Sequence, residues 1–224
     1  MNVTIYGDSI LKGVLLENGR YVINREWEKR FTDSLDITLV NRSRFGCTIP
    51  KALDLIRKDS EKPIEFEAGA YALLELGGND CDYDWAQIAG DPKRDYDCKT
   101  PPAQFREGYR RAIDLIRSGG RRPVLVTLPP IHSERYLRFI CRKGLSRENI
   151  LTWLGDVDAI YRWQEMYSDM VTELARKEGA PLIDLRSAFL ADDHTPEELL
   201  CTDGIHPSRC GQDVMFRAFQ TAVA

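Results

Sequence analysis

The stretch Gly7-Asp8-Ser9-Ile10 places a serine at the end of a short apolar segment near the start of the chain. Val3 and Ile5 predict a buried strand that the glycine ends, so the serine hydroxyl is expected above the sheet edge. A serine hydroxyl is a weak nucleophile until a base removes its proton. The chain must therefore supply a base, a residue that orients the base, and donors for an oxyanion. The alternative is a turn in which Asp8 and Ser9 bond only local backbone.

Three further polar stretches follow apolar segments later in the chain. They are residues 41–48 with Gly46 among them, Gly77-Gly78-Asn79-Asp80, and Thr202-Asp203-Gly204-Ile205-His206-Pro207. In open α/β sheets ligands bind beyond the carboxyl ends of the strands, and a parallel sheet brings those ends to one edge. Together the four stretches hold the parts that acyl transfer requires: a nucleophile, a base, an orienting acid and oxyanion donors.

Each of these later stretches also has an interpretation without catalysis. Gly46 is then a loop glycine chosen for its backbone freedom. Asn79 and Asp80 then cap a helix or form an Asx-turn. Asp203 and His206 then begin the last helix, with the following proline in its first turn. No single stretch decides between the two interpretations, and the case for chemistry rests on all four together.

The order of the segments predicts an α/β fold with a parallel sheet between helix layers, because strands and helices alternate along the whole chain. Strands are predicted at residues 3–5, 37–40, 70–76, 123–128 and 181–185. Helices are predicted at residues 25–35, 50–58, 105–116, 152–179 and 207–222. No repeat, low-complexity tract or linker divides the chain, so one domain over residues 1–224 is expected.

Three segments outside this pattern are predicted to be irregular: residues 11–24, 81–100 and 132–149. The first has Asn18-Gly19 as its turn signal, and the second is acidic with scattered aromatic residues. The third mixes aromatic and basic side chains. Three interpretations of it stay open: a flap whose aromatic side chains wall an acyl pocket, a contact between subunits, and a solvated surface helix.

Several other residues with chemical potential are assigned to structure. Aromatic side chains at helical spacing within residues 152–179 are assigned to the core: Trp153, Tyr161, Trp163 and Tyr167. His132 and His194 are assigned to the surface or to loops, because neither has a carboxylate at a spacing like that of Asp203 and His206. The six cysteines show no C-x-x-C pair and no zinc-type cluster, so they are interpreted as reduced thiols.

Composition narrows the choice of partners. The 224 residues are 43% hydrophobic and 29% charged, with a formal charge of −4, which gives no reason to expect nucleic acid or an anionic membrane as partner. No apolar run approaches the roughly 20 residues of a membrane-spanning helix. Met1 leads directly into the first predicted strand without a signal peptide, so a cytoplasmic location is expected. A homo-oligomer stays open.

The four polar stretches resemble the four motif blocks of the SGNH (GDSL-type) hydrolase superfamily, in the order that the family has them. The first block matches Gly7-Asp8-Ser9-Ile10, with isoleucine in place of leucine, and Gly46 matches the single glycine of the second. The third, G-x-N-D, matches residues 77–80, and the last, D-x-x-H, matches residues 203–206. The resemblance covers nearly the whole chain. The Gly-x-Ser-x-Gly elbow of α/β-hydrolases does not fit, because position 11 is leucine.

The resemblance implies a three-layer α/β/α sandwich of flavodoxin-like type, with a central parallel sheet of about five strands. It also implies Ser9 as nucleophile, His206 as general base and Asp203 as the residue that orients the imidazole. The oxyanion hole would consist of the N–H groups of Ser9 and Gly46 and the side-chain amide of Asn79. Neutral donors of this kind can be fixed in advance where negative charge develops. The resemblance calls for no cofactor and no metal.

The function expected from these residues is hydrolysis of a carboxylic ester through an acyl-enzyme on Ser9. A short acyl or acetyl ester is the first candidate, with an ester on a carbohydrate as one form of it. An acyl thioesterase or a lysophospholipase on the same site is the alternative. Two other classes are a non-catalytic binding domain and a metal-dependent hydrolase, the latter with four candidate ligands: Asp8, Asp80, Asp203 and His206. The substrate remains open, since loops grafted onto one fold serve many functions.

Overall fold

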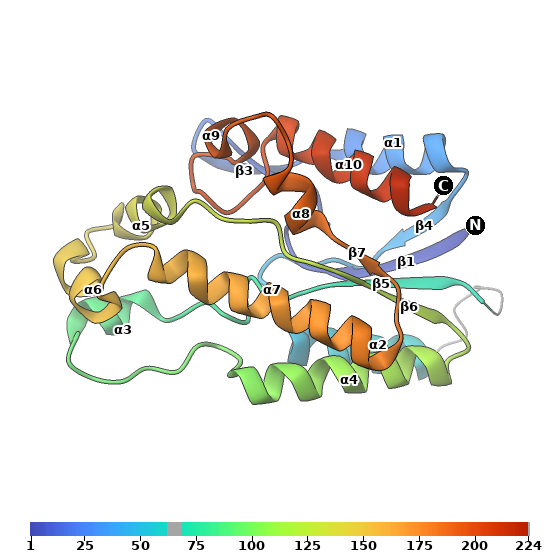
Figure 1. The fold of residues 1–224 in the computed structure, drawn as a ribbon, viewed down its shortest axis with the longest axis horizontal. Coiled ribbons are helices and arrows are strands. Elements are labelled where there is room, and N and C mark those ends of the chain that lie inside the picture. The colour runs from blue at the N-terminus through green and yellow to red at the C-terminus, as the bar shows by residue number, and fades with distance from the viewer. Residues whose placement is uncertain (62–68, 224) are drawn as a thin grey trace.

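A five-stranded, all-parallel sheet lies at the centre of the protein (Figure 1). The computed structural model describes residues 1–61 and 69–223. The order of the strands across the sheet is β4-β1-β5-β6-β7. Their bounds are Asn2–Gly7 for β1, Thr38–Asn41 for β4, Tyr71–Glu75 for β5, Arg122–Val126 for β6 and Leu182–Ile183 for β7. All five lie where strands are predicted from the sequence.

Helices cover both faces of this sheet (Figure 1). One face carries α1 (Arg25–Leu35), α8 (Leu185–Leu190) and α10 (Arg209–Val223). The other carries α2 (Ile49–Glu61), α4 (Pro102–Ser118) and α7 (Ala159–Glu178). A separate apolar cluster fills each of the two interfaces, one around Phe31 and Phe219 and the other around Phe105 and Tyr167. The predicted three-layer α/β/α fold is therefore confirmed.

The strand order creates a switch point between β1 and β5. The second strand of this sheet, β4, lies on one side of β1, while β5 and the strands after it lie on the other side. Connections from the two central strands therefore leave in opposite directions, which opens a crevice at their carboxyl ends. Gly7 at the end of β1 is in register with Glu75 at the end of β5. The residues directly after both strands thus meet at this crevice.

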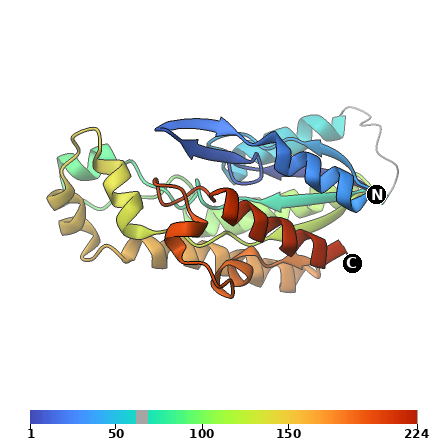
Figure 2. The ribbon, with the colours of Figure 1, turned by 90° about the horizontal axis from the view of Figure 1, so that it is seen from above.

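The prediction of a loop at residues 11–24 is wrong, because this segment forms an antiparallel hairpin. Its strands are β2 (Val14–Glu17) and β3 (Arg20–Ile23). Asn18 and Gly19 connect them with φ values of +50° and +74°, the left-handed pair that a two-residue type I′ turn requires. Figure 2 shows the hairpin as a two-stranded element separate from the main sheet.

A cap of three short helices lies beyond one end of the sheet (Figure 1). It consists of α3 (Trp85–Gly90), α5 (Ser133–Cys141) and α6 (Arg147–Leu154). The segments 81–100 and 132–149, predicted to be irregular, therefore contribute helices that pack together. Buried Ile88, Leu137 and Ile150 form a third apolar cluster between them. A solvated surface helix is thus the wrong interpretation of α5, whose Leu137 is fully buried.

The helix predicted over residues 152–179 is two helices. Gly155 has a φ of +81°, and its N–H bonds to the carbonyl oxygen of Leu151 at the end of α6. Such a left-handed glycine commonly ends a helix. The chain then turns through residues 156–158 before α7 begins. Two short helices near the C-terminus were not predicted either, α8 and α9 (Pro196–Leu199).

The six cysteines are all free thiols: Cys47, Cys81, Cys98, Cys141, Cys201 and Cys210. Within residues 1–61 and 69–223, no helix has both the length and the apolar character that crossing a bilayer demands.

A buried polar network ties α2 to the sheet. Asp59 of α2 is 4% exposed, and its carboxylate accepts hydrogen bonds from the Tyr6 hydroxyl at 3.1 Å and from Arg42 Nε at 2.9 Å. A second Arg42 nitrogen completes the pair with the same carboxylate. Arg121 donates to the Tyr6 hydroxyl at 2.8 Å. One carboxylate on α2 therefore satisfies donors from β1 and from the segment after β4.

Replacing this carboxylate tests the network. We expect Asp59→Ala to lower the free energy of unfolding by about 2 kcal/mol, because hydrogen bonds to a charged, buried group are lost. Urea denaturation followed by circular dichroism measures the change. Asp54→Ala on the same helix is the control, since that side chain is 68% exposed and pairs with the exposed Arg57; its effect should stay within about 0.5 kcal/mol. Equal losses in the two variants would contradict the network.

Candidate active site

Ser9 lies in a tight turn directly after β1. The N–H of Lys12 donates to the Asp8 carbonyl at 3.1 Å and the N–H of Val14 to the Ser9 carbonyl at 3.0 Å, so the chain bends sharply here. A Cβ on Gly7 would lie 3.0 Å from Ser43 Oγ, in the loop after β4. A larger side chain at position 7 would require Ser43 to move, so the glycine favours the close approach of these two loops. Ser9 is 7% exposed, at the edge of the crevice between β1 and β5.

His206 joins Ser9 to Asp203 in one line of hydrogen bonds. The distance from His206 Nε2 to Ser9 Oγ is 2.9 Å, and the distance from Nδ1 to Asp203 Oδ2 is 2.7 Å. Both residues are buried, with exposures of 2% for the histidine and 0% for the aspartate. The three residues predicted from the sequence as nucleophile, base and orienting acid are therefore brought together. Their positions in the sequence are up to 197 residues apart.

The Asp203 carboxylate is held in its charged form. Burial alone pushes its pKa upward, but hydrogen bonds and charge from His206, with the N–H groups of Ile205 and His206, outweigh it. The pKa of Asp203 therefore lies below its usual range. A carboxylate at Nδ1 fixes the imidazole tautomer that has its free lone pair on Nε2.

Backbone hydrogen bonds hold the loop that carries Asp203 and His206 at both of its ends and near its middle. The N–H of Cys201 donates to the His206 carbonyl at 2.8 Å, and a β-bridge pairs Leu200 with Pro207. The N–H of His132, just before α5, donates to the Gly204 carbonyl at 2.8 Å. Gly204 has a φ of +76°, and a Cβ there would lie 2.6 Å from the His132 carbonyl oxygen. This glycine thus lets the loop pack directly against the cap.

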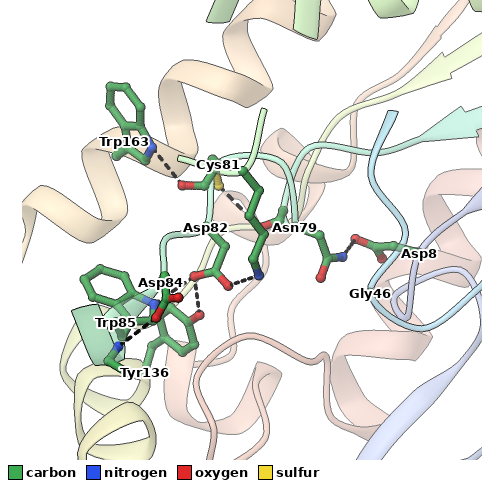
Figure 3. A network of polar contacts seen from close by, with 12 residues as sticks. Asp8, Gly46, Asn79, Cys81, Asp82, Asp84, Trp85, Tyr136 and Trp163 are labelled. Atoms are coloured by element: carbon green, nitrogen blue, oxygen red, sulfur yellow. Dashed lines mark hydrogen bonds and ion pairs between the residues drawn. The ribbon is translucent and has the colours of Figure 1, made fainter. Parts of the chain in front are cut away.

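Asn79 follows β5 and points toward Asp8 (Figure 3). Its Nδ2 donates to Asp8 Oδ2 at 2.8 Å, and the N–H of Ile10 donates to Asp8 Oδ1 at 2.8 Å. A side-chain amide has two N–H bonds, so one remains for a ligand. Asp8 is thereby a buried acceptor that orients the amide of Asn79.

Glu75 lies beside this pair, and the sequence interpretation gave it no role. It is 1% exposed, it is in register with Gly7, and burial followed by the Asp8 charge raises its pKa well above the usual value. Burial also raises the pKa of Asp8. Two carboxyl groups so close cannot both ionise easily, so Glu75 keeps its proton. The sequence did contain a signal for such a role, because Glu75 is an ionisable residue within the otherwise apolar segment 70–76.

Gly46 lies in the loop after β4 with a φ of +66°. Its carbonyl accepts a hydrogen bond from Lys51 Nζ at 2.9 Å. In the described part of the chain, the backbone N–H groups of Gly46 and Ser9 have no acceptor. Both predicted backbone donors are therefore available to a ligand.

Asp80 has a structural place instead. It is fully buried, and its Oδ1 accepts the N–H of Ile49 at 2.9 Å, which caps the start of α2. Burial raises its pKa to about 6. The capping interpretation is therefore correct for Asp80, although the helix is α2 rather than the next one along the chain. Among residues 1–61 and 69–223, no three His, Cys, Asp or Glu side chains gather as metal ligands would.

Comparison with known proteins agrees with this geometry. The profile of the GDSL-like Lipase/Acylhydrolase family matches residues 5–214. The chain belongs to this family. The predicted class of enzyme, an ester hydrolase of SGNH type, is confirmed with it.

Individual relatives add detail. The chain is 25% identical over 220 residues to the isoamyl acetate-hydrolyzing esterase of Saccharomyces cerevisiae, covering 94% of this chain and 80% of that protein. The lipase/acylhydrolase structure from Enterococcus faecalis aligns with a TM-score of 0.65 at 21% identity, over 99% of this chain and 94% of that one. A catalytic mutant of an acetylxylan esterase from Geobacillus stearothermophilus aligns with a TM-score of 0.66 at 16% identity, over 100% and 94%. At these identities the two structures support the fold alone.

A pocket of about 290 Å³ opens from Ser9, Asn79 and His206 toward the cap. Five aromatic side chains wall it: Tyr83, Trp85, Tyr136, Trp153 and Trp163. The core assignment is therefore wrong for Trp153 and Trp163, which contact the apolar clusters and also face the pocket. It holds for Tyr167, which is fully buried. Tyr136 in the segment 132–149 lies in the wall, as the flap interpretation expects.

Four of these five aromatic rings have their polar atom bonded to the protein, and Figure 3 shows those of Trp85, Tyr136 and Trp163. Asp82 accepts from Trp85 Nε1 and from the Tyr136 hydroxyl, both at 2.8 Å, and from Lys99 Nζ at 2.6 Å. Trp163 Nε1 donates to the Cys81 carbonyl at 2.8 Å. Trp153 Nε1 donates to a backbone carbonyl at 3.1 Å. The rings therefore present carbon surface to the pocket.

Each of the two other histidines lies beside a carboxylate, although neither carboxylate is three residues before its histidine as Asp203 is before His206. His132 Nε2 lies 2.9 Å from Glu197 Oε1, and His194 Nδ1 lies 2.6 Å from Asp192 Oδ1. The partner of His132 is 65 residues away, so its spacing gave no signal. The predicted surface or loop position holds for both: His194 is exposed, and the half-buried His132 lies in the loop just before α5.

Gly204 provides a test of how far the loop geometry controls turnover. We expect Gly204→Ala to lower kcat for p-nitrophenyl acetate by about 10²-fold, because the new Cβ displaces the segment that carries Asp203 and His206. Gly120→Ala is the matched control, since Gly120 has a similar φ of +73° but no atom within 4 Å of its Cβ position. It carries the same backbone strain without the clash. Equal rates in the two variants would refute the role of close packing.

Proposed function

We propose that the chain hydrolyses carboxylic esters through a covalent acyl-enzyme on Ser9. The observation that carries the proposal is the line of hydrogen bonds from Ser9 Oγ through His206 to Asp203, at 2.9 and 2.7 Å. This arrangement has the geometry by which a serine is activated and a base is oriented. In this role Ser9 is the nucleophile, His206 the general base and Asp203 the positioning acid.

Each step follows from the same three side chains. Ser9 Oγ bonds to the carbonyl carbon while its proton moves to His206 Nε2, and the carbonyl electron pair moves to oxygen. The tetrahedral intermediate then expels the alcohol oxygen, which takes the proton from Nε2. A water molecule repeats the attack on the acyl-enzyme with His206 again as base, and Ser9 leaves with the proton. Asp203 stays charged throughout and stabilises the imidazolium.

The oxyanion of both intermediates needs donors that are already in place. The N–H groups of Ser9 and Gly46 and the second N–H of Asn79 are the candidates, and Asp8 orients the amide. Because Glu75 keeps its proton, this corner of the site carries one negative charge from the two carboxyl groups rather than two. Each fixed donor of this type is worth roughly 2.7–4 kcal/mol in the transition state.

The size and lining of the pocket favour an ester of a short acyl group with an apolar alcohol. Its volume of about 290 Å³ equals roughly ten water-sized groups, so an acetyl group alone would leave most of it empty. Four aromatic polar atoms bond to the protein, so few donors remain for sugar hydroxyls. We therefore place an apolar alcohol in the pocket. The yeast relative, an isoamyl acetate-hydrolyzing esterase, fits this choice.

Partner and location stay predictions from the sequence. They comprise a small-molecule ester, no nucleic acid or membrane partner, a cytoplasmic location and one domain over residues 1–224. A thioester or lysophospholipid substrate at the same site is an outcome that the substrate series below would reveal.

Removing the nucleophile or the base tests the mechanism. We expect Ser9→Ala and His206→Ala each to lower kcat for p-nitrophenyl acetate by about four orders of magnitude or more, and Asp203→Ala by less. Mass spectrometry should also find a fluorophosphonate probe on Ser9 and on no other residue. Wild-type turnover by the serine variant would rule the mechanism out. Activity lost in EDTA and restored by a divalent metal would instead favour the metal-dependent alternative.

A series of esters tests the pocket. With the acetyl group fixed, we expect kcat/KM to rise as the alcohol lengthens from ethyl to isoamyl, and Trp153→Ala to move the optimum to larger alcohols by removing one wall. Tyr96→Ala is the control, because Tyr96 packs on Trp153 but does not line the pocket. A series with a fixed alcohol and lengthening acyl group is run beside it. If only that second series responds to Trp153→Ala, the pocket holds the acyl half.

A further inference from the structure

Two aromatic rings lie against the imidazole of His206. The Tyr21 ring centroid is 5.1 Å from the imidazole, with the planes at 60°, and the Phe45 ring is 6.0 Å away in a stacked arrangement at 26°. The two rings also contact each other, with centroids 5.2 Å apart. We call Tyr21 and Phe45 the aromatic cover.

Packing into a core does not account for these two side chains. Phe45 is 55% exposed and Tyr21 is 39% exposed, while the imidazole beneath them belongs to a residue that is only 2% exposed. The rings thus lie between His206 and solvent. Leaving large apolar side chains exposed forgoes the stabilisation that their burial would give. A role at the imidazole explains why they stand there.

Two separate elements deliver the cover. Tyr21 comes from β3, which the Asn18-Gly19 turn folds back toward the site. Phe45 directly precedes Gly46 in the loop after β4. Phe139 of α5 continues the aromatic surface, 6.4 Å from Tyr21, with Arg142 stacked on it at 3.6 Å. None of these residues is one of those matched to the family motifs, although Phe45 lies within the stretch 41–48.

The imidazole becomes positively charged when it takes the proton of Ser9. A cation within about 6 Å of an aromatic ring centroid is attracted by the ring, more strongly where water is excluded. We propose that Tyr21 and Phe45 are positioning residues that stabilise the imidazolium of His206 during acylation and deacylation. This inference rests on the proposed function, in which His206 is the base.

The titratable and charged groups around His206 come from several elements. The carboxylates of Asp203 and Asp8 interact with the imidazole, while Arg142, the Tyr21 hydroxyl and the Cys201 thiol lie near Tyr21 or Asp203. The variants below keep all of these groups except the Tyr21 hydroxyl, which the Tyr21 variants remove. Burial and then the Asp203 charge raise the pKa of Tyr21 to about 12, and burial raises the pKa of Cys201. Both groups are therefore neutral near neutral pH. Replacing a ring by an aliphatic side chain changes the π-face and leaves the carboxylates and Arg142 in place.

Histidine NMR measures the effect without any substrate. The chain has three histidines, so three titration curves are expected, and the one missing from His206→Ala is assigned to His206. The variants are Tyr21→Leu, Phe45→Leu and the double variant, which keep an apolar cover but remove the rings. We expect each to lower the titration midpoint of His206 by about half a pH unit, since the charged form loses a ring partner. Tyr21→Phe keeps the ring and removes only the hydroxyl near Asp203, so the midpoint should not fall in this variant.

The pH profile of kcat/KM gives the second measurement. Its acid limb should move to lower pH in the leucine variants, in step with the NMR midpoint, with kcat reduced about threefold per ring and KM little changed. An unchanged midpoint would overturn the inference. A midpoint that moves to higher pH would overturn it too, because the rings would then act only by excluding water.

The outcome for Ser9→Ala separates this inference from the proposed function. If Ser9→Ala keeps wild-type turnover, the proposed function fails, and the catalytic role of the cover fails with it. If Ser9→Ala is inactive while the leucine variants leave the His206 midpoint and the acid limb in place, only the role of the aromatic cover fails.

Discussion

The hydrogen bond between Asp203 and His206 is the interaction on which the rest of the site depends. It places a charged carboxylate at a position with no solvent exposure, which is costly unless the charge is fully bonded. Three donors meet that demand: the imidazole and the N–H groups of Ile205 and His206. They can do so only in one loop conformation. The β-bridge at the base of the loop, the left-handed Gly204 and the contact with His132 all maintain that conformation.

A second constraint is the density of carboxyl groups around a site that is proposed to stabilise negative charge. Asp8, Glu75 and Asp203 are all buried near Ser9. The structure assigns them different states: Asp203 is charged beside the imidazole, and Glu75 keeps its proton beside Asp8. Asp8 in turn holds the Asn79 amide. Neighbouring titratable groups with pKa values shifted in opposite directions are common in functional sites, because their different environments give them different roles.

The sequence predicted the layered sheet and the positions of its five strands well, because period and punctuation are strong signals in long apolar segments. It failed where the elements are short. The strands around Asn18-Gly19 lack clean alternation, so the turn signal was seen without its hairpin. The helices of the cap bury few residues each and stabilise one another through Leu137 and Ile150, a contact that no local pattern encodes.

The sequence also did not separate the pocket wall from the core. Both need the same apolar side chains, so periodicity did not distinguish Trp153 from Tyr167. The contact between Ser9 and His206 was inferred from family resemblance, since spacing alone cannot show that residues so far apart meet.

The distance in sequence between Ser9 and His206 affects when the enzyme becomes active as it folds during synthesis. Ser9 emerges from the ribosome 197 positions ahead of its base, His206. A nascent chain can therefore form β1, the oxyanion loops and the first crossovers long before any base is present. Contacts this distant in sequence are also entropically costly and form late. Chemical competence should thus appear only when the final helix docks, so esterase activity reports on completion of folding rather than on its onset.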